Sequence, residues 1–225
     1  MRLTALILSL FLIAPSVKAA AVKKYAALTF DDGPHPVYTA KILKILYDNN
    51  VTATFFVVGE NAERYPQLVK AEHDLGCEIG NHTYSHPHLA KTHIGKIEEE
   101  ILKTDGIIKD ITGMTPKLFR PPEGFCTGQI EKELIKLEKT EVLWNVDTRD
   151  WAHTETDKIV ENIKCNVKNG SVILFHDYTS PPTHTVEALE IVVPYLLDSG
   201  FELVTVSELM ARKADTGGLS SFFIG

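Results

Sequence analysis

Runs of apolar residues alternate with helix-type patterns along most of the chain. Short runs rich in β-branched and aromatic residues predict strands, and apolar positions three and four residues apart predict the helices between them. The predicted strands are 25–30, 52–58, 77–80, 118–120, 142–146, 171–175 and 202–206. The predicted helices are 37–47, 66–75, 94–111, 129–139, 157–167, 185–199 and a short turn at 207–211. No repeat or low-complexity linker interrupts this series, so it favours a single α/β domain.

Polar motifs lie at the ends of five of these predicted strands. Strands that alternate with helices predict a parallel sheet, either closed as a barrel or open, and in both cases ligands gather at the carboxyl ends of the strands. The motifs are Asp31-Asp32 after the first strand, His82 and His86 after the third, Arg120 at the end of the fourth, Asp147 to Trp151 after the fifth and His176 at the end of the sixth. Their shared position indicates one site.

The Asp pair and the two histidines suggest a metal centre. Carboxylates beside apolar surface are costly unless they meet a cation or donors. His82 and His86 are four residues apart, and Pro87 disfavours a helix there, so a tight loop is expected to place both imidazoles on one side. Two histidines and one aspartate form a three-ligand set with open positions, which suits catalytic zinc and also non-haem iron.

Zinc in such a site fits the hydrolysis of an amide or ester. It lowers the pKa of a bound water and polarises a carbonyl oxygen, and the second aspartate can take the proton of that water. A general acid is still required, and His176 is the histidine that directly ends a strongly predicted strand. Purely structural interpretations remain open here: Arg120 as a loop ion pair, Trp151 as core, and His176 with Asp177 as a capping pair.

Five ordered motifs resemble those of a known family. They are Thr29-Phe30-Asp31-Asp32-Gly33, His82-Thr83-Tyr84-Ser85-His86, Arg120-Pro121-Pro122-Glu123-Gly124, Asp147-Thr148-Arg149-Asp150-Trp151 and Leu174-Phe175-His176. From about residue 25 to 210 the chain resembles the polysaccharide deacetylases, the NodB-homology domain of carbohydrate esterase family 4. The resemblance implies a distorted (β/α) barrel of about seven parallel strands and a divalent metal, usually Zn²⁺, with Co²⁺ as another option. It implies hydrolysis of N-acetyl groups on polysaccharide that contains N-acetylglucosamine, or of O-acetyl groups in some members.

The resemblance also assigns a role to each site residue. The residues alone do not show which member of the Asp pair is the metal ligand and which is the base. It makes Asp32, His82 and His86 the metal ligands and Asp31 the base. It makes Arg120 the residue that orients Asp31, His176 the general acid and Asp150 the carboxylate that tunes His176. The expected substrate-binding residues are Pro122, Glu123, Trp151 and Leu174, with a backbone N–H at position 123 for the oxyanion. The family often has an aromatic residue where this chain has Glu123, which bears on substrate preference.

The N-terminus has the layout of a secretory signal peptide. Arg2 precedes an apolar run over 3–14 and small residues at 19–21, a run too short to span a bilayer comfortably, although a retained anchor is the alternative. We therefore expect a signal peptide at 1–20, a catalytic domain at 21–212 and a loose tail at 213–225. The expected location is secreted or in the cell envelope, and no membrane span is expected after cleavage.

Composition narrows the class of partner. The chain has 225 residues, 44% hydrophobic, and a formal charge of −7, which becomes −9 when Arg2 and Lys18 leave with residues 1–20. An acidic surface argues against nucleic acid and favours a neutral or basic carbohydrate polymer or oligomer. Cys77, Cys126 and Cys165 form no CxxC pair and are expected to be free thiols, although export would permit one disulfide. A monomer is expected.

Two other functions use part of the same motifs. A catalytically silent glycan-binding module would not need a complete set of ligands, base and acid. A non-haem iron oxygenase would use the three-ligand set but explains neither Arg120 nor His176. Within the hydrolase interpretation, the residues do not separate peptidoglycan, chitin oligomers and acetylated xylan.

Overall fold

The structure is a computed structural model and describes residues 23–178 and 184–215. The expected signal peptide at 1–20 and the end of the expected tail, 216–225, lie outside the described residues. The strands are β1 (Lys24–Asp31), β2 (Thr54–Val57), β3 (Glu78–Asn81), β4 (Leu118–Phe119), β5 (Thr140–Glu141), β6 (Val146–Asp147), β7 (Ser171–His176) and β8 (Phe201–Leu203).

The strands form one parallel sheet whose centre is β1. Seven of the described strands follow the order β5-β4-β3-β2-β1-β7-β6, and β8 pairs with β1 near its start. Parallel pairing joins all of these neighbours. The path curls as a partial barrel, which confirms the predicted distorted (β/α) barrel of about seven parallel strands in a single domain.

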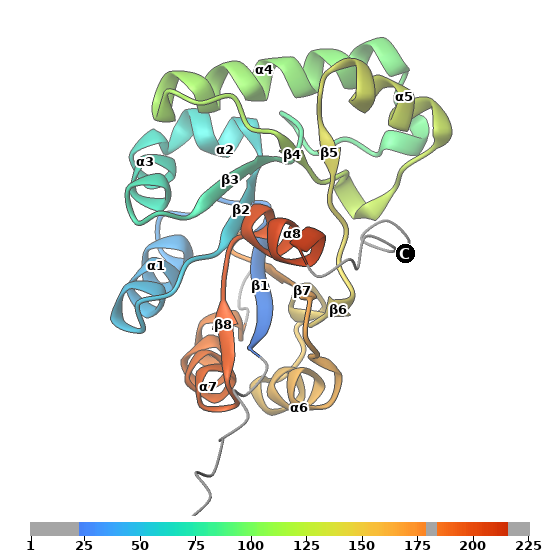
Figure 1. The fold of residues 1–225 in the computed structure, drawn as a ribbon. Helices are drawn as coiled ribbons and strands as arrows, with labels where there is room; N and C mark the ends of the chain where they lie inside the picture. The colour runs from blue at the N-terminus through green and yellow to red at the C-terminus, as the bar shows by residue number, and fades with distance from the viewer. Residues whose placement is uncertain (1–22, 179–183, 216–225) are drawn as a thin grey trace, which may run out of the picture.

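Helices follow the outer face of the curled sheet as a continuous row (Figure 1). The row runs in contact order α6, α7, α1, α3, α4 and α5. The α-helices are α1 (Tyr38–Asp48), α2 (Gly59–Arg64), α3 (Pro66–Asp74), α4 (Ile94–Thr112), α5 (Gly128–Lys136), α6 (Thr156–Asn166), α7 (Thr185–Asp198) and α8 (Val206–Asp215). Short 3₁₀ turns are η1 (Leu89–Lys91), η2 (Pro122–Gly124) and η3 (Asp150–Ala152).

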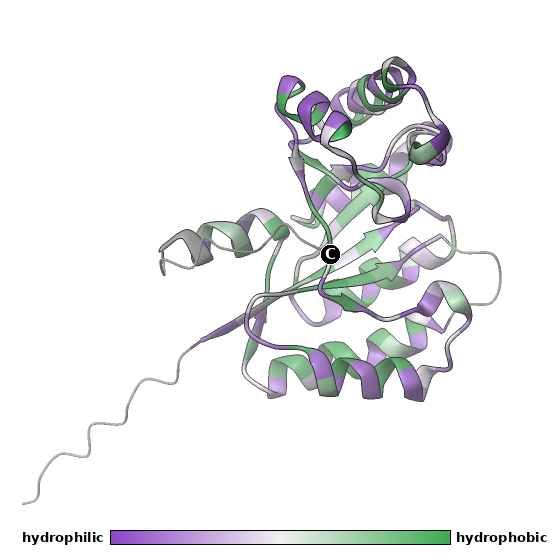
Figure 2. Ribbon diagram, turned by 90° about the vertical axis from the view of Figure 1, so that its right-hand side faces the viewer, coloured by the Kyte–Doolittle hydropathy of each residue, from purple (hydrophilic) through white to green (hydrophobic). Residues whose placement is uncertain are grey.

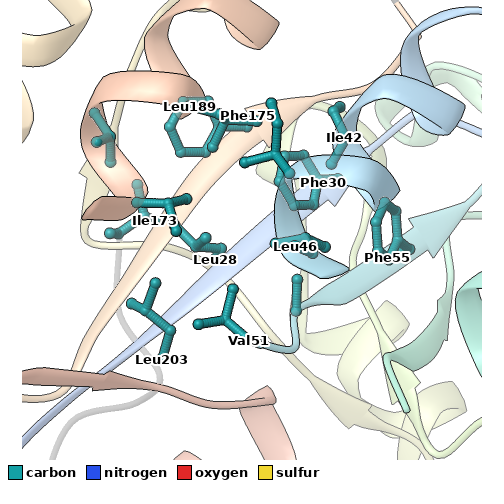
Figure 3. Close-up of a cluster of buried hydrophobic side chains, with 14 of the residues drawn as sticks. Leu28, Phe30, Ile42, Leu46, Val51, Phe55, Ile173, Phe175, Leu189 and Leu203 are labelled. Atoms are coloured by element: carbon teal, nitrogen blue, oxygen red, sulfur yellow. The ribbon is translucent and has the colours of Figure 1, made fainter. Parts of the chain in front are cut away.

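Alternating residues of the central strands separate two cores. Leu28 and Phe30 face the helices, where the Phe30 ring stacks 4.9 Å from Phe55 and 5.7 Å from Phe175 (Figure 3). Ala27 faces the other side, where α8 covers the start of the sheet. In Figure 2 the central strands are mostly green, and the helices around them are green and purple in turn. Because side chains alternate along a strand, Thr29 and Asp31 share the inner face of Ala27.

The structure departs from the predicted elements in three places. Of the predicted strand 142–146 only Val146 lies in a strand, β6, and residues 142–145 connect it to β5, which pairs with the opposite end of the sheet path. Helix α2 was not predicted. Helix α8 reaches Asp215, beyond the predicted turn at 207–211. None of the helices in the described part of the chain has the length and apolar character needed to cross a bilayer.

Candidate active site

Asp31 ends β1 as a buried carboxylate held by Arg120. The Nη1 of Arg120 donates to Asp31 Oδ1 at 2.7 Å and to Thr29 Oγ1 at 2.8 Å. Both side chains are buried, with Arg120 fully enclosed. A guanidinium paired with a carboxylate in this way fixes the direction of the carboxylate as well as balancing its charge.

Arg120 is itself held by the segment predicted as a strand. Its Nε donates to the carbonyl oxygen of Val142 at 3.0 Å and its Nη2 to that of Leu143 at 3.2 Å. The guanidinium carbon lies 4.1 Å from the ring centroid of Phe56. These carbonyls bond a side chain instead of a neighbouring strand, which explains the interruption between β5 and β6.

Asp32, His82 and His86 converge beside Asp31. Asp32 Oδ1 lies 3.4 Å from Nε2 of His82 and 3.4 Å from Nε2 of His86, and this oxygen is buried without a hydrogen-bond partner. Asp31 Oδ2 is farther from His82 Nε2, at 3.9 Å. A φ of 74° at Asp32 turns its side chain away from the course of the strand. Asp32 is therefore the member of the pair that joins the histidines.

His82 presents Nε2 to this cluster because its other nitrogen is engaged. Nδ1 lies 2.7 Å from the carbonyl oxygen of Arg120, which accepts the Nδ1 proton. A histidine bound in this way leaves Nε2 as an unprotonated ligand, the arrangement usual for metal-binding histidines. The rings of His82 and His86 are tilted to each other with centroids 5.0 Å apart.

The cluster has a negative electrostatic character. Burial alone would lower the pKa of His82, but the charges of Asp31 and Asp32 raise it above its ordinary value. Burial alone would raise the pKa of Asp32, yet the interaction with His82, whose Nε2 lies 3.4 Å from Oδ1, lowers it. The two carboxylates thus favour positive charge at His82, whereas burial and then the charge of His82 lower the pKa of His86.

His176 ends β7 and bonds to Asp150. Its Nδ1 donates to Asp150 Oδ1 at 2.8 Å, and its backbone N–H donates to Asp150 Oδ2 at 2.8 Å. Asp150 also accepts from Thr185 Oγ1 at 2.7 Å and from the Trp151 N–H at 2.9 Å. Burial alone would lower the pKa of His176, but Asp150 raises it to about 9.

The four expected substrate-binding residues occupy different environments. Pro122 is buried, and Leu174 is buried on the same face of β7 as His176. Trp151 is 48% exposed. Glu123 is exposed, has a φ of 59° and pairs through Oε2 with Nδ1 of His88 at 3.0 Å. The side chain of Glu123 therefore lies at the surface of the protein.

Sequence reasoning missed several groups that support the site. Asp177 is buried, accepts from Thr39 Oγ1 and packs against Gly33, where a Cβ would lie 2.2 Å from its carboxylate. Glu100 of α4 accepts backbone N–H groups from the loop between His82 and His86. A polar residue inside an apolar helical pattern is the one signal that sequence offers for Glu100. Cys77 is buried, Cys126 half-buried and Cys165 exposed, and all three are free.

The chain is similar to proteins named as carbohydrate-modifying enzymes. A sequence profile of polysaccharide deacetylases matches residues 18–142. A peptidoglycan-N-acetylglucosamine deacetylase of Bacillus cereus is 42% identical over 86% of this chain and 70% of its own.

Solved structures agree with the sequence comparison. The peptidoglycan deacetylase PdaC of Bacillus subtilis matches with a TM-score of 0.81 and 34% identity, over 87% of this chain and 94% of its own. A family 4 acetyl xylan esterase of Clostridium thermocellum, solved with a cobalt ion, matches with a TM-score of 0.80 and 35% identity, over 85% of this chain and 92% of its own.

Proposed function

The chain belongs to the polysaccharide deacetylase family, and from that premise we propose that it removes N-acetyl groups from N-acetylglucosamine units of a cell-envelope polysaccharide. Peptidoglycan is the first substrate to test, because similar proteins are named for it. Such a substrate lies outside the cytoplasm, which agrees with the signal peptide expected at 1–20. The observation that carries the proposal is the convergence of Asp31, Asp32, His82, His86 and His176 at one end of the sheet.

The Asp32, His82 and His86 donors fit a divalent metal. Asp32 Oδ1 is buried without a partner and lies 3.4 Å from each histidine Nε2. Ligands at about 2.1 Å from a tetrahedral zinc are separated by about 3.4 Å, so these atoms already have a suitable spacing. One carboxylate and two imidazoles suit Zn²⁺, and they accept Co²⁺ as well. When bound there, the metal would lower the pKa of a water and polarise the acetyl carbonyl.

Asp31 is placed to take the proton of the attacking water. Its Oδ1 is occupied by Arg120, while its Oδ2 faces the histidine cluster, 3.9 Å from His82 Nε2. Arg120 thus aims the free oxygen of Asp31 at the reacting atoms. The charge on the guanidinium also offsets the negative charge of the Asp pair.

His176 is placed to return a proton to the leaving amine. Asp150 holds Nδ1, so Nε2 is the nitrogen that faces the substrate. With a pKa of about 9 the imidazole is charged at neutral pH and has a proton to give. Leu174 and Trp151 would contact the acetyl methyl group, and the Glu123 N–H would donate to the oxyanion.

Acetate release tests the proposal directly. Purified protein is incubated with peptidoglycan, N-acetylglucosamine oligomers and acetylated xylan, each with a chelator, with chelator followed by Zn²⁺, and with neither. We expect acetate from the two N-acetylglucosamine substrates, loss with the chelator and recovery with Zn²⁺. Acetate release from xylan alone would indicate that the protein is an O-acetyl esterase. Acetate release that is the same with and without the chelator would exclude the metal centre.

A further inference from the structure

The loop between His82 and His86 has a backbone that needs support from outside. Thr83 and His86 have φ values of 67° and 52°, in the left-handed region that costs a non-glycine residue about 1 kcal/mol or more. Left-handed residues also break the regular pattern of local hydrogen bonds. The separation of the two histidines therefore depends on the groups that bind this loop.

Helix α2 binds the carbonyl side of the loop. The N–H groups of Gly59 and Glu60, in its first turn, donate to the carbonyl oxygens of Thr83 and Tyr84, both at 2.9 Å. The approach is close, because a Cβ at Gly59 would lie 3.0 Å from the Tyr84 Cα. Helix α2 lies beside α4 in Figure 1, so the loop lies against two neighbouring helices.

Helix α4 binds the N–H side of the loop through one buried carboxylate. Glu100 Oε2 accepts the N–H of Tyr84 at 3.0 Å and that of Ser85 at 2.7 Å. The Ser85 hydroxyl lies 3.1 Å from both carboxylate oxygens. Glu100 is only 4% exposed. A buried glutamate is rare unless it is paired, and this one meets three donors from a single loop.

We propose that Glu100 is a positioning residue that sets His86 relative to His82 and thereby sets the affinity of the metal centre. This inference rests on the proposed metal site at Asp32, His82 and His86. The side chain of Glu100 bonds to Tyr84 and Ser85, between the two histidines, and acts on the ligands through them. An ionised carboxylate only accepts hydrogen bonds, so it matches the two N–H groups and the hydroxyl that this side of the loop presents to α4.

Glu100→Gln separates this role from simple space filling. Glutamine keeps the size of the side chain but removes the charge, so the hydrogen bonds that Oε2 accepts from the Tyr84 and Ser85 N–H groups become weaker neutral ones, and the ion pair of Oε1 with Lys96 at 3.6 Å is lost. Glu99→Gln is the matched control, because Glu99 is the adjacent residue on α4, is exposed, and bonds to Lys96 at 3.3 Å. Ser85→Ala removes only the hydroxyl donor.

The measurement is the affinity of the purified protein for Zn²⁺, by competition with a chelator, together with the absorption spectrum of the Co²⁺ form. We expect Glu100→Gln to weaken Zn²⁺ binding by up to about 10- to 100-fold, the cost of losing a group bonded directly to a metal ligand, because Glu100 acts on His86 through Tyr84 and Ser85. We also expect an altered Co²⁺ spectrum. Glu99→Gln should match the parent, and Ser85→Ala should weaken binding by a smaller factor.

Circular dichroism and thermal unfolding of the metal-free variants show whether the fold is kept. If Glu100→Gln has the same Zn²⁺ affinity and the same Co²⁺ spectrum as the parent, the inference is overturned. If Glu100→Gln does not fold, Ser85→Ala becomes the test. A Ser85→Ala protein with the same Zn²⁺ affinity as the parent would then overturn the inference. The proposed metal site has its own control, because undiminished Zn²⁺ binding by His82→Ala would refute that site instead.

Discussion

Asp31 and His176 are paired residues on the neighbouring parallel strands β1 and β7. Side chains of paired residues leave a sheet on the same face, so the proposed base and the proposed acid reach the site from adjacent strands. Each has its own buried partner of opposite charge, Arg120 behind Asp31 and Asp150 behind His176. The two proton-transfer roles can therefore be changed separately by substitution.

Asp150→Asn should shift the alkaline limb of the pH–rate profile to lower pH. Asp150 raises the pKa of His176 to about 9 against the opposing effect of burial. Without that charge the pKa falls, and the acid loses its proton at a lower pH. Activity should drop little at low pH and most at high pH. The readout is kcat from pH 5 to 10, with Asp147→Asn as the control from the same motif. An equal loss at every pH would make Asp150 purely structural.

His176→Ala should lower kcat by roughly 10²- to 10⁴-fold, the usual effect of losing an acid–base group. Metal content should not change, because His176 lies outside the ligand set. An amine leaving group needs the proton more than an alcohol does, so the loss should be larger on an N-acetyl than on an O-acetyl substrate. The two rates are compared by acetate release. Equal losses would indicate that His176 stabilises charge and is not the proton donor.

Glu123→Tyr should change the order of KM values among the three glycans while leaving the metal content unchanged. The carboxylate is exposed and bonds to His88, which follows the proposed ligand His86 by two residues in the chain. Tyrosine would replace a charge by a surface on which a sugar can stack. Glu138→Tyr is the control, since Glu138 also has a positive φ and an exposed ion pair, with Lys117. An unchanged order would show that Glu123 does not contact substrate.

The strand ends were the most predictable part of this molecule. Buried strands have a strong pattern of apolar residues in the sequence. The rule that ligands gather at the carboxyl ends of such strands correctly predicted that Asp31, His82, Arg120 and His176 lie together. The segment 142–146 has the composition of a strand, but its carbonyl groups bind Arg120. That choice depends on a residue more than twenty positions away, which a local pattern does not contain.

Helix α2 and the order of the Asp pair were beyond prediction from the residues alone. The sequence of α2 is short and mostly polar, and its first N–H groups are satisfied by the loop at Thr83 and Tyr84. Its formation therefore depends on tertiary contacts. Asp31 and Asp32 are chemically identical, and the backbone turn at Asp32 directs it toward the histidines. The resemblance to the family assigned this pair, whereas local propensity did not.

Asp177→Asn should stabilise the metal-free protein at alkaline pH. Burial and then the charge of Asp32 raise the pKa of Asp177 from 3.8 to about 7. The folded chain thus holds a proton that the unfolded chain releases, and the free energy of unfolding falls as pH rises between these values, by up to about 4 kcal/mol. Asparagine cannot ionise, so this fall should disappear in the variant.

Urea unfolding with a chelator at pH 5 and pH 8 measures this effect. The advantage of Asp177→Asn over the parent should be larger at pH 8 than at pH 5. Asp110→Asn, an exposed aspartate on α4, should change neither value. His176, with a pKa of about 9 in the folded chain, also makes stability depend on pH, but it does so in both proteins, so its effect cancels in the difference. A variant less stable than the parent by the same amount at both pH values would contradict the prediction.

Two adjacent carboxylates have separate roles in the proposed mechanism, Asp32 as metal ligand and Asp31 as base. Zinc content and acetate release from an N-acetylglucosamine oligomer, measured together on Asp31→Asn and Asp32→Asn, test it most directly. Asp31→Asn should keep its zinc and lose activity by roughly 10²- to 10⁴-fold, the range for a lost general base. Asp32→Asn should lose both zinc and activity. An Asp32→Asn protein that keeps full zinc, or an Asp31→Asn protein that keeps its rate, would contradict the account.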